Sequence, residues 1–276
     1  MEKNTDMKRI DLIQVEHNRK MGEACEYIEP NVTEDCIFYA DGEPIGFYLT
    51  KMPEKMCKLA DLANAEFNSK RVPKVITYRN STINIAKKNN ISLKKATELF
   101  PNLCVQQKSA ILGGVALNRQ MARYYNNISS LHSIKTAETF IKAMLLLAKE
   151  SELLIKELLP KQYEQQIELF KDVDEKWRFG NLFTSSISNF NISAPFHKDN
   201  ANIVGTVNVI ICKKFNSKGG DLHIPDYNAT IGQQDNSMLV YPAWRNVHGV
   251  TSIIPTFKGG YRNSLVFYPL KAFKGL

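Results

Sequence analysis

The sequence predicts a mixed α+β protein in which a helix-rich part, residues 1–175, packs on a β-rich part, residues 176–276. Over much of residues 54–170, apolar side chains recur with the spacing of helices that bury one face. After Phe183 the pattern changes to short apolar runs that end in Gly, Asn or Pro, which is typical of strands joined by tight turns. Metal-binding residue types stand at the ends of these runs, so we expect a small β-barrel that holds a metal.

Residues 35–50 are predicted to form a β-hairpin. The apolar runs Cys36–Tyr39 and Ile45–Leu49 flank a turn at Asp41-Gly42. The last hundred residues alone are too few for a barrel of two full sheets, so we expect this hairpin to join one of the sheets. No Ser-, Gly- or Pro-rich linker separates the two parts, which favours one domain over residues 1–276.

Helices are predicted over residues 54–68, 92–100, 110–125 and 135–170. Ser92 is expected to cap the second helix, which Pro101 ends, and Pro160 is expected to break the last one. Between the first two helices, residues 75–79 are predicted to form a strand because they are rich in β-branched and aromatic side chains.

The β-rich part is predicted to contain strands within residues 189–196, 204–212, 237–242 and 263–269. Each of these runs is short and apolar, and polar or turn-forming residues follow it. Residues 213–218 contain three lysines and are expected to form a basic hairpin tip, which either touches a nucleic-acid backbone or is solvated.

His197, Asp199 and His248 form the candidate metal site. His197 and Asp199 are two residues apart, so their side chains point to the same side if they lie on or just past a strand. His248 must then come from another strand that folds back onto them. Two imidazoles and one carboxylate on one face of a metal are the ligand set of non-haem Fe(II) oxygenases. A lone His-x-Asp pair is more often a surface turn, but the strands around this one favour a site.

Arg262 follows His248 by 14 residues, about one strand and one turn later. That distance suits a guanidinium at the far end of the same pocket, where its planar fork holds a carboxylate by two hydrogen bonds. The sequence therefore predicts an iron site with a carboxylate-binding arginine beside it.

Composition excludes several other classes of protein. The apolar and charged fractions are ordinary for a globular chain, and no apolar run approaches the length of a membrane span. The N-terminus lacks the apolar segment of a secretory signal. Five scattered cysteines without a CxxC pair argue against a zinc finger or disulfide framework and favour a cytoplasmic setting.

The formal net charge of +8 favours an anionic partner such as nucleic acid. The alternative is a lysine-rich surface on a composition heavy in Asn, Ile and Lys, and the charge alone leaves both interpretations open. The sequence carries no signal for an oligomeric state.

Three segments resemble the TET methylcytosine oxidases, a family of Fe(II)/2-oxoglutarate dioxygenases. His197–Asn202 (His-Lys-Asp-Asn-Ala-Asn) is similar to their His-x-Asp-x-x-Asn metal loop, and Leu222–Tyr227 is similar to their Leu-His-Val-Leu-Pro-Leu-Tyr stretch. Arg262–Tyr268 (Arg-Asn-Ser-Leu-Val-Phe-Tyr) is similar to their Arg-Ile-Ser-Leu-Val-Phe-Tyr run. The same clan includes the J-binding-protein thymine hydroxylases. The resemblance covers about the last ninety residues and indicates a compact microbial or phage-borne member.

The resemblance implies a double-stranded β-helix core of jelly-roll (cupin-like) type. It implies that His197, Asp199 and His248 bind Fe(II), and that O₂ and 2-oxoglutarate are co-substrates. Arg262 and Ser264 would bind the distal carboxylate of 2-oxoglutarate, with His223 as a further candidate contact. Asn202 stands where the family contacts the target base. Ala201 replaces a second base-contacting histidine of the TET enzymes, so base recognition differs here.

The expected function is oxidation of the 5-methyl group of a pyrimidine in methylated DNA, from 5-methylcytosine to 5-hydroxymethylcytosine and further, or of thymine. One alternative keeps the chemistry and replaces DNA with a protein side chain or a small metabolite. An alternative of a different class is a catalytically inactive nucleic-acid-binding protein, against which the complete ligand set and Arg262 argue.

Overall fold

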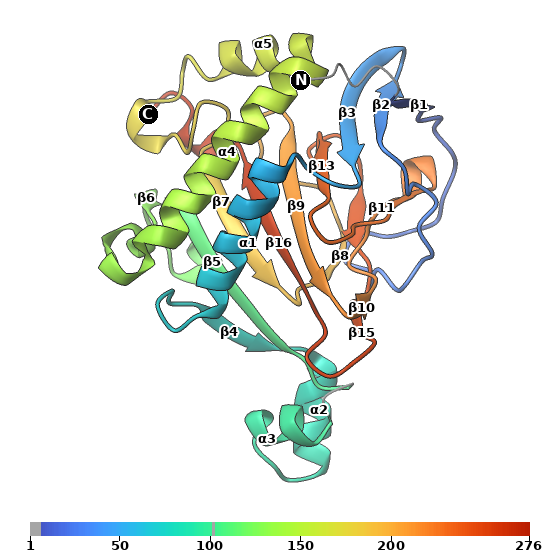
Figure 1. The fold of residues 1–276 in the computed structure, drawn as a ribbon, viewed down its shortest axis with the longest axis vertical. Coiled ribbons are helices and arrows are strands. Elements are labelled where there is room, and N and C mark those ends of the chain that lie inside the picture. Colours follow the sequence, from blue (N-terminus) through green and yellow to red (C-terminus); the bar gives the residue numbers. More distant parts are fainter. Residues whose placement is uncertain (1–6, 101–102) are drawn as a thin grey trace.

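Two β-sheets that pack face to face form the centre of the molecule (Figure 1). They are described here from a computed structural model, which covers residues 7–100 and 103–276. Buried side chains of both sheets, among them Phe38, Tyr48, Leu222 and Ile231, form one apolar cluster between them. This sandwich confirms the predicted jelly-roll core.

The larger sheet is antiparallel except for the parallel pair β1–β2 at one edge. Its strands are, in spatial order, β1 (Lys8–Asp11), β2 (Cys36–Ala40), β3 (Glu43–Leu49), β13 (Met238–Tyr241), β9 (Asn208–Phe215), β16 (Tyr261–Tyr268), β7 (Ser185–Phe190), β5 (Gln106–Val115) and β4 (Val75–Tyr78), with β6 (Asn127–Ile128) beside β5. The predicted hairpin is therefore confirmed as β2–β3, and it joins this sheet through β13.

The smaller sheet has four short antiparallel strands. They are, in spatial order, β12 (Ala229–Ile231), β11 (Leu222–Ile224), β14 (His248–Val250) and β8 (Ala194–His197). A separate two-stranded ribbon, β10 (Ser217–Lys218) with β15 (Ile254–Pro255), lies near the start of β16. β8 is an edge strand of this smaller sheet.

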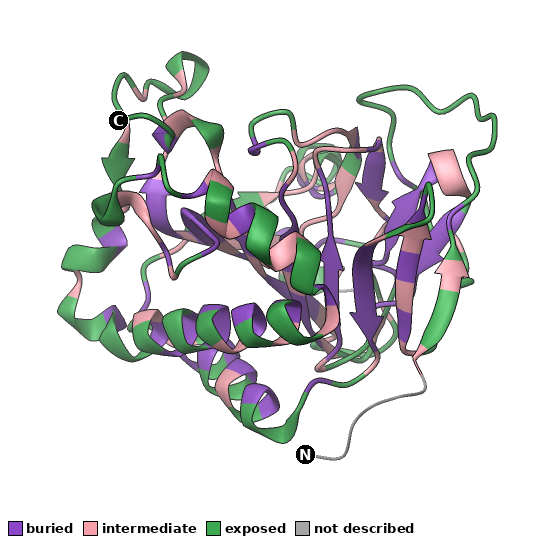
Figure 2. Cartoon of the chain, turned by 90° about the horizontal axis from the view of Figure 1, so that it is seen from above, coloured by how far each residue is buried: buried purple, intermediate pink, exposed green. Residues whose placement is uncertain are grey.

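Helices cover the other face of the larger sheet. They are α1 (Glu54–Asn68), α4 (Glu138–Leu158) and α5 (Pro160–Leu169), while α2 (Asn80–Lys88) and α3 (Leu93–Leu99) form a separate protrusion (Figure 1). Figure 2 shows that the helices bury one side and expose the other. The buried sides of α1 and α4 pack against β9, β13 and β16 in the largest apolar cluster.

The predicted helices over residues 54–68 and 135–170 are confirmed, and Pro160 begins α5 as the expected break. Ser92 caps α3 by accepting a hydrogen bond from the Lys95 amide. Pro101 lies outside the described residues. None of the described helices is long and apolar enough to cross a membrane, and all five cysteines are free and buried.

The predicted helix over residues 110–125 is wrong. This stretch begins within β5, which pairs with β7 on one side and with β4 on the other. Leu112 and Ala110 favour helices in isolation, but the sheet offers them a buried position and backbone partners. Long-range pairing of this kind leaves no local signal in the sequence.

A strap, residues 12–32, crosses the outer face of the smaller sheet. Its backbone exchanges hydrogen bonds with β8, since the Gly22 amide donates to Phe196 (2.7 Å) and the Phe196 amide donates to Glu23 (2.9 Å). The Ser252 amide donates to Cys25 at 3.0 Å. The strap therefore buries the side of this sheet that faces away from the larger one.

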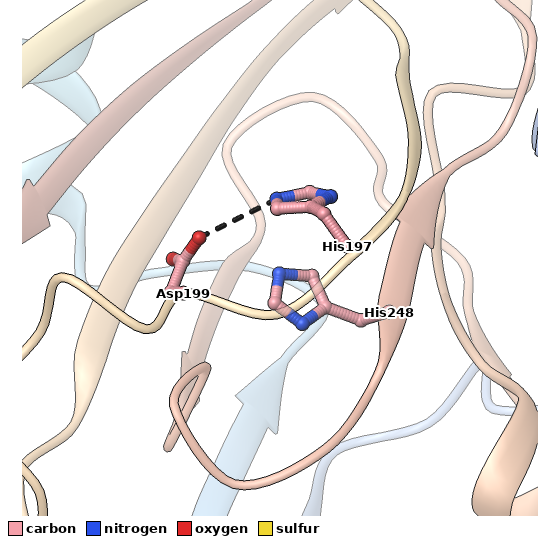
Figure 3. Close-up of side chains that lie close together, drawn as sticks. All are labelled: His197, Asp199 and His248. Carbon is pink, nitrogen blue, oxygen red and sulfur yellow. Dashed lines mark ion pairs between the residues drawn. The ribbon is translucent and has the colours of Figure 1, made fainter. Parts of the chain in front are cut away.

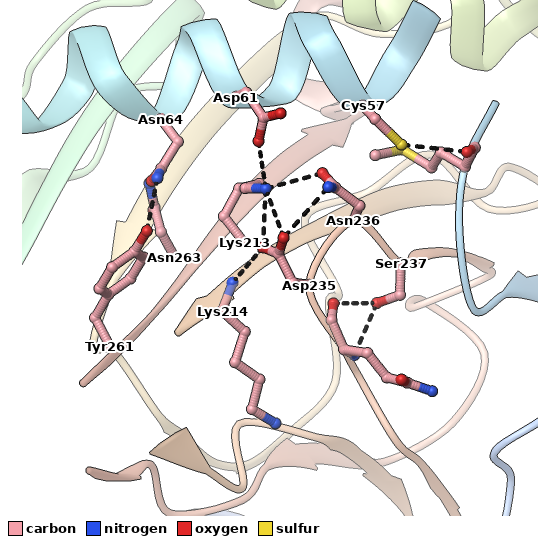
Figure 4. A network of polar contacts seen from close by, with 12 residues as sticks. Cys57, Asp61, Asn64, Lys213, Lys214, Asp235, Asn236, Ser237, Tyr261 and Asn263 are labelled. Atoms are coloured by element: carbon pink, nitrogen blue, oxygen red, sulfur yellow. Dashed lines mark hydrogen bonds and ion pairs between the residues drawn. The ribbon is translucent and has the colours of Figure 1, made fainter. Parts of the chain in front are cut away.

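Lys213 is buried, although residues 213–218 were expected to form a solvated or DNA-contacting tip, so that prediction is wrong for this residue. Its ammonium group donates to Asp61 of α1 (2.6 Å), Asp235 (2.9 Å) and Asn236 (2.9 Å). Figure 4 shows the three partners surrounding the lysine. Burial lowers the pKa of Lys213. The two carboxylates raise the pKa by a larger amount, so the net pKa lies above the ordinary value. The lysine thus ties α1 to the larger sheet as a cation.

We predict that Lys213→Met lowers the free energy of unfolding by about 1–3 kcal/mol, because Asp61 and Asp235 lose a hydrogen-bonded countercharge. The matched control is Lys161→Met, which removes an exposed lysine that lies 3.4 Å from Glu43 and should change stability by less than about 0.5 kcal/mol. Urea unfolding of the two variants measures the difference. Equal stabilities would show that the Lys213 network contributes nothing beyond a surface pair.

Candidate active site

His197, Asp199 and His248 come together in the space between the sheets (Figure 3). His197 ends β8 and His248 begins β14, and the two residues lie directly opposite each other in the antiparallel pair. Their ring centroids are 4.4 Å apart, and one ligand atom from each of the three residues lies within 4.8 Å of the others. The expectation that a second strand brings His248 back onto the His-x-Asp segment is confirmed.

Both imidazoles are held through their Nδ1 atoms. Nδ1 of His197 lies 2.7 Å from the Pro195 carbonyl, and Nδ1 of His248 lies 3.0 Å from the Asn246 carbonyl. A carbonyl only accepts, so Nδ1 carries a proton in each ring, which leaves Nε2 as the atom that a metal would bind. This orientation by a second partner is typical of histidines that bind metals.

The Asp199 carboxylate is fixed from the other side. Its Oδ2 atom accepts from the side-chain amides of Asn208 (3.1 Å) and Asn202 (3.5 Å), while Oδ1 faces His197 Nε2 at 3.4 Å. Asn202 also donates to Asn208 Oδ1 at 2.9 Å, so the two amides brace each other. One carboxylate oxygen is therefore occupied, and the other is directed at the histidines.

The titration behaviour of the three groups reflects this arrangement. The hydrogen bond with Asp199 raises the pKa of His197, whereas burial and then the His197 charge lower the pKa of His248. Burial raises the pKa of Asp199. Its hydrogen bonds and the charges of both histidines lower the pKa by a larger amount, so the net pKa lies below the ordinary value. An anionic carboxylate beside a neutral buried imidazole is the protonation state that a divalent cation requires.

The three residues line a cavity of about 300 Å³ between the sheets. This volume is at the lower end of the range for small-molecule sites. Arg262, Ser264, Val266 and Tyr268 alternate along β16, and all four line the cavity. Arg262 and Tyr268 thus lie at opposite ends of this row, about 20 Å apart at about 3.4 Å per residue.

Arg262 is almost fully buried and has unused hydrogen-bonding capacity. One terminal nitrogen donates to Gln233 Oε1, but the Nε atom of Arg262 and the Nε2 atom of Gln233 are buried without a partner among the described residues. Buried donors without acceptors are costly, and a bound carboxylate would satisfy them. This end of the cavity therefore fits an anionic ligand.

Lys214 adds positive charge next to Arg262. Its Nζ atom lies 3.5 Å from the buried carboxylate of Asp221 and donates to the Gln233 carbonyl at 2.9 Å. Burial raises the pKa of Asp221 although both cations oppose the shift. Two cations face one carboxylate here, which leaves an excess of positive charge at the Arg262 end.

Gly219 and Gly220 allow the chain to approach Ser252 and Arg262 closely. Both have positive φ angles, 69° and 74°. A Cβ atom on Gly220 would lie 3.0 Å from Arg262 Cδ, and one on Gly219 would lie 1.9 Å from the Ser252 carbonyl oxygen. Only glycine combines this conformation with this spacing.

His223 is not brought into the cavity. Leu222 lines it, so the next side chain on β11 points to the outer face of the smaller sheet. There the His223 ring lies 2.9 Å from the Thr230 hydroxyl and packs edge-on against Phe196. Asn202 does line the cavity, with its amide engaged by Asp199 and Asn208.

Three further residues of the cavity were missed by the sequence reasoning. Asn208 braces Asp199, and Asn189 and Tyr268 line the cavity. The only signal for Asn208 was an amide inside the predicted strand of residues 204–212, and Asn189 is the amide at the start of the predicted strand of residues 189–196. Burial raises the pKa of Tyr268 to about 12, with the Asp199 charge as a second cause.

Known structures resemble this chain in fold. No protein-family model matches it, and no curated protein matches it either. NgTET1, solved in complex with 5mC DNA, superposes with a TM-score of 0.59 at 14% identity, covering 98% of this chain and 84% of NgTET1. A full-length Neurospora crassa protein, solved in complex with alpha-KG, gives a TM-score of 0.44 at 9% identity, covering 82% of this chain and 75% of that one.

A third match is a 2OG-Fe(II) oxygenase family oxidoreductase from Burkholderia pseudomallei, with a TM-score of 0.41, 12% identity, and coverage of 81% of this chain and 84% of that one. At 14% identity the match to NgTET1 shows a shared fold, which extends over nearly the whole of this chain. This likeness of fold agrees with the resemblance to the TET enzymes in the last ninety residues.

We predict that His197→Ala, Asp199→Ala and His248→Ala each weaken Fe(II) or Co(II) binding by at least about a hundredfold, because each removes one of three protein ligands. Asn208→Ala is the matched comparison. It removes a partner of Asp199 but no ligand, and should weaken binding by about 10- to 100-fold. Titration followed by Co(II) absorbance measures both effects. Wild-type affinity in any of the three alanine variants would remove that residue from the ligand set.

Proposed function

We propose that this protein is an Fe(II)/2-oxoglutarate-dependent dioxygenase that oxidises the 5-methyl group of a pyrimidine in DNA. The observation that carries the proposal is one cavity that is lined both by His197, Asp199 and His248 and by the buried, unsatisfied Arg262. Three protein ligands leave open positions on a metal for a bidentate co-substrate and O₂. A catalytically inactive nucleic-acid-binding protein has no need of this arrangement.

The chain fits iron through its free Nε2 atoms and the Oδ1 atom of Asp199. Bound iron supplies the oxidation that couples decarboxylation of 2-oxoglutarate to hydroxylation of a carbon. The protein holds the ligands rigidly through Pro195, Asn246 and Asn208, and it surrounds them with apolar side chains that limit the access of water.

The Arg262 end of the cavity fits the distal carboxylate of 2-oxoglutarate. The unpartnered Nε atom of Arg262 and its terminal nitrogen form a planar fork, and Lys214 keeps the region positive. Ser264 is the next inward-facing residue of β16 toward the metal, so its hydroxyl can donate to the same carboxylate. His223 lies on the other face of its sheet, which makes it a structural support of β11 in this proposal.

The Tyr268 end of the cavity remains for the substrate. Tyr268, Leu270 and Ala201 line it, and this small apolar surface suits a methyl group and a planar ring. A base inside a duplex cannot reach a site between two sheets, so it must leave the stack. The TET-like fold and the net charge of +8 support DNA as its source. Ala201 leaves both 5-methylcytosine and thymine as targets.

Asn202 has two roles in this proposal. The resemblance assigns it to the target base, and its hydrogen bonds place it against Asp199 and Asn208. Replacement by alanine would then reduce both base recognition and the positioning of Asp199. The competing substrates, a protein side chain or a small metabolite, would use the same metal and the same Arg262 end.

The deciding experiment incubates the enzyme with iron, 2-oxoglutarate and DNA that contains 5-methylcytosine or thymine, as duplex and as single strands. We expect 5-hydroxymethylpyrimidine nucleosides by mass spectrometry, and none with His248→Ala as the matched inactive protein. Hydroxylation of a peptide or metabolite without any oxidised base would replace DNA with that substrate.

Arg262→Lys should raise the 2-oxoglutarate concentration needed for half-maximal succinate formation by at least about tenfold, because an ammonium group cannot form the two-point contact of a guanidinium. Ser264→Ala should act in the same direction through the loss of one hydrogen bond to a charged group, about 1.5–3 kcal/mol. Metal affinity should remain at the wild-type level in both variants. An unchanged 2-oxoglutarate requirement in Arg262→Lys would contradict the assigned role.

A further inference from the structure

Residues 117–126 form a small hairpin between β5 and β6, called here the Arg-Tyr hairpin. Asn118 and Arg123 exchange backbone hydrogen bonds of 2.8 and 3.0 Å, which close the turn around Arg119–Met121. The Leu117 amide donates to Asn126 Oδ1 at 2.9 Å and fixes the base of the hairpin. The turn is therefore an ordered projection whose tip residues are free to contact a partner.

The hairpin exposes an unusual amount of apolar and aromatic surface. The exposed fractions are 51% for Leu117, 69% for Met121, 65% for Tyr124 and 82% for Tyr125. Scattered exposed apolar residues are common, but four large ones within nine residues form a patch, and such patches mark interaction surfaces. Nothing else in the described part of the chain covers them.

The charge of this region has one sign. Residues 99–137 contain no Asp or Glu, whereas Arg119 and Arg123 lie within the hairpin itself. Arg119 is exposed, and the Nε atom of Arg123 is buried without a partner among the described residues. Arginines close to exposed tyrosines are a combination that binds a nucleic-acid strand, through phosphate contacts and base stacking.

The hairpin lies next to the substrate end of the cavity. Asn126 donates to the Ala272 carbonyl at 2.9 Å, and the Lys271 amide donates to the carbonyl of Ala201, a cavity residue. The Arg123 charge is close enough to Tyr268 to oppose the rise in the pKa of that phenol. A strand held on the hairpin would thus run past the end of the cavity where a base enters.

We infer that the Arg-Tyr hairpin is the DNA-strand contact beside the extruded base, with Arg119 and Arg123 on the phosphates and Met121, Tyr124 and Tyr125 against neighbouring bases. This inference rests on the proposed function and adds the surface that presents DNA to the cavity. The hairpin holds the strand next to the gap that the extruded base leaves. A protein partner is the competing occupant, although the arginines and the absence of acidic residues favour a polyanion.

The test compares Arg119→Ala/Tyr125→Ala with a matched control, Phe257→Ala/Lys258→Ala. The control also removes one exposed ring and one exposed cation, but from the turn before β16, at the opposite end of that strand from Tyr268. Fluorescence anisotropy with a duplex that carries one 5-methylcytosine measures Kd over a series of salt concentrations. Thermal unfolding and Co(II) affinity report whether each variant is intact.

We expect the hairpin variant to bind DNA about tenfold or more weakly, with the slope of log K against log salt reduced by about one, because one stacking contact and one phosphate contact are lost. The control should bind within about twofold of wild type. Equal weakening of both variants, unchanged affinity of the hairpin variant, or no DNA binding by the wild type would overturn the inference.

The inference and the proposed function fail separately. If the wild type binds DNA through the hairpin but yields no oxidised nucleoside, the hairpin stands and the proposed oxidation fails. If oxidised nucleosides form at the same rate and the same DNA concentration in the wild type and the hairpin variant, the oxidation stands and the hairpin is not its DNA contact.

Discussion

The antiparallel pairing of β8 with β14 is the constraint on which the site depends. It sets His197 directly opposite His248, and it turns both imidazoles inward while Phe196 and Gly249 face outward. A shift of the register by one residue would send one histidine to the outer face. The strap over residues 12–32 holds β8 by backbone hydrogen bonds and packs Cys25 against Gly249, so it protects this register from outside.

The larger sheet supplies one wall of the cavity, and strands of the smaller sheet and connecting loops supply the rest. β16 carries Arg262, Ser264 and Tyr268 on one face, at fixed steps from the metal-binding residues. α1 and α4 pack on the opposite face, and the buried Lys213 joins α1 to the sheet. The polar groups of the site thus lie on a sheet that is packed against helices on its other face. This packing keeps Arg262 in place even though its hydrogen bonds are only partly satisfied.

The two ends of the cavity along β16 differ in charge. The Arg262 end has two cations for one carboxylate and suits an anion, whereas the Tyr268 end is apolar and suits a ring with a methyl group. Under the proposed function, a co-substrate at the Arg262 end and a substrate at the Tyr268 end would not compete for one position.

The sequence by itself determined the ligand types, the strand-rich C-terminal part and the helices with strong apolar periodicity, because these depend on residue chemistry and on local spacing. Motif spacing also placed Arg262 in the pocket of the two histidines. Only the tertiary structure decided that residues 110–115 are a strand, that Lys213 is buried and that His223 faces away from the cavity. It also decided that Asn208 braces Asp199. The pairing partner of a strand and the face that a residue presents depend on contacts between distant segments, and no local pattern in the chain records them.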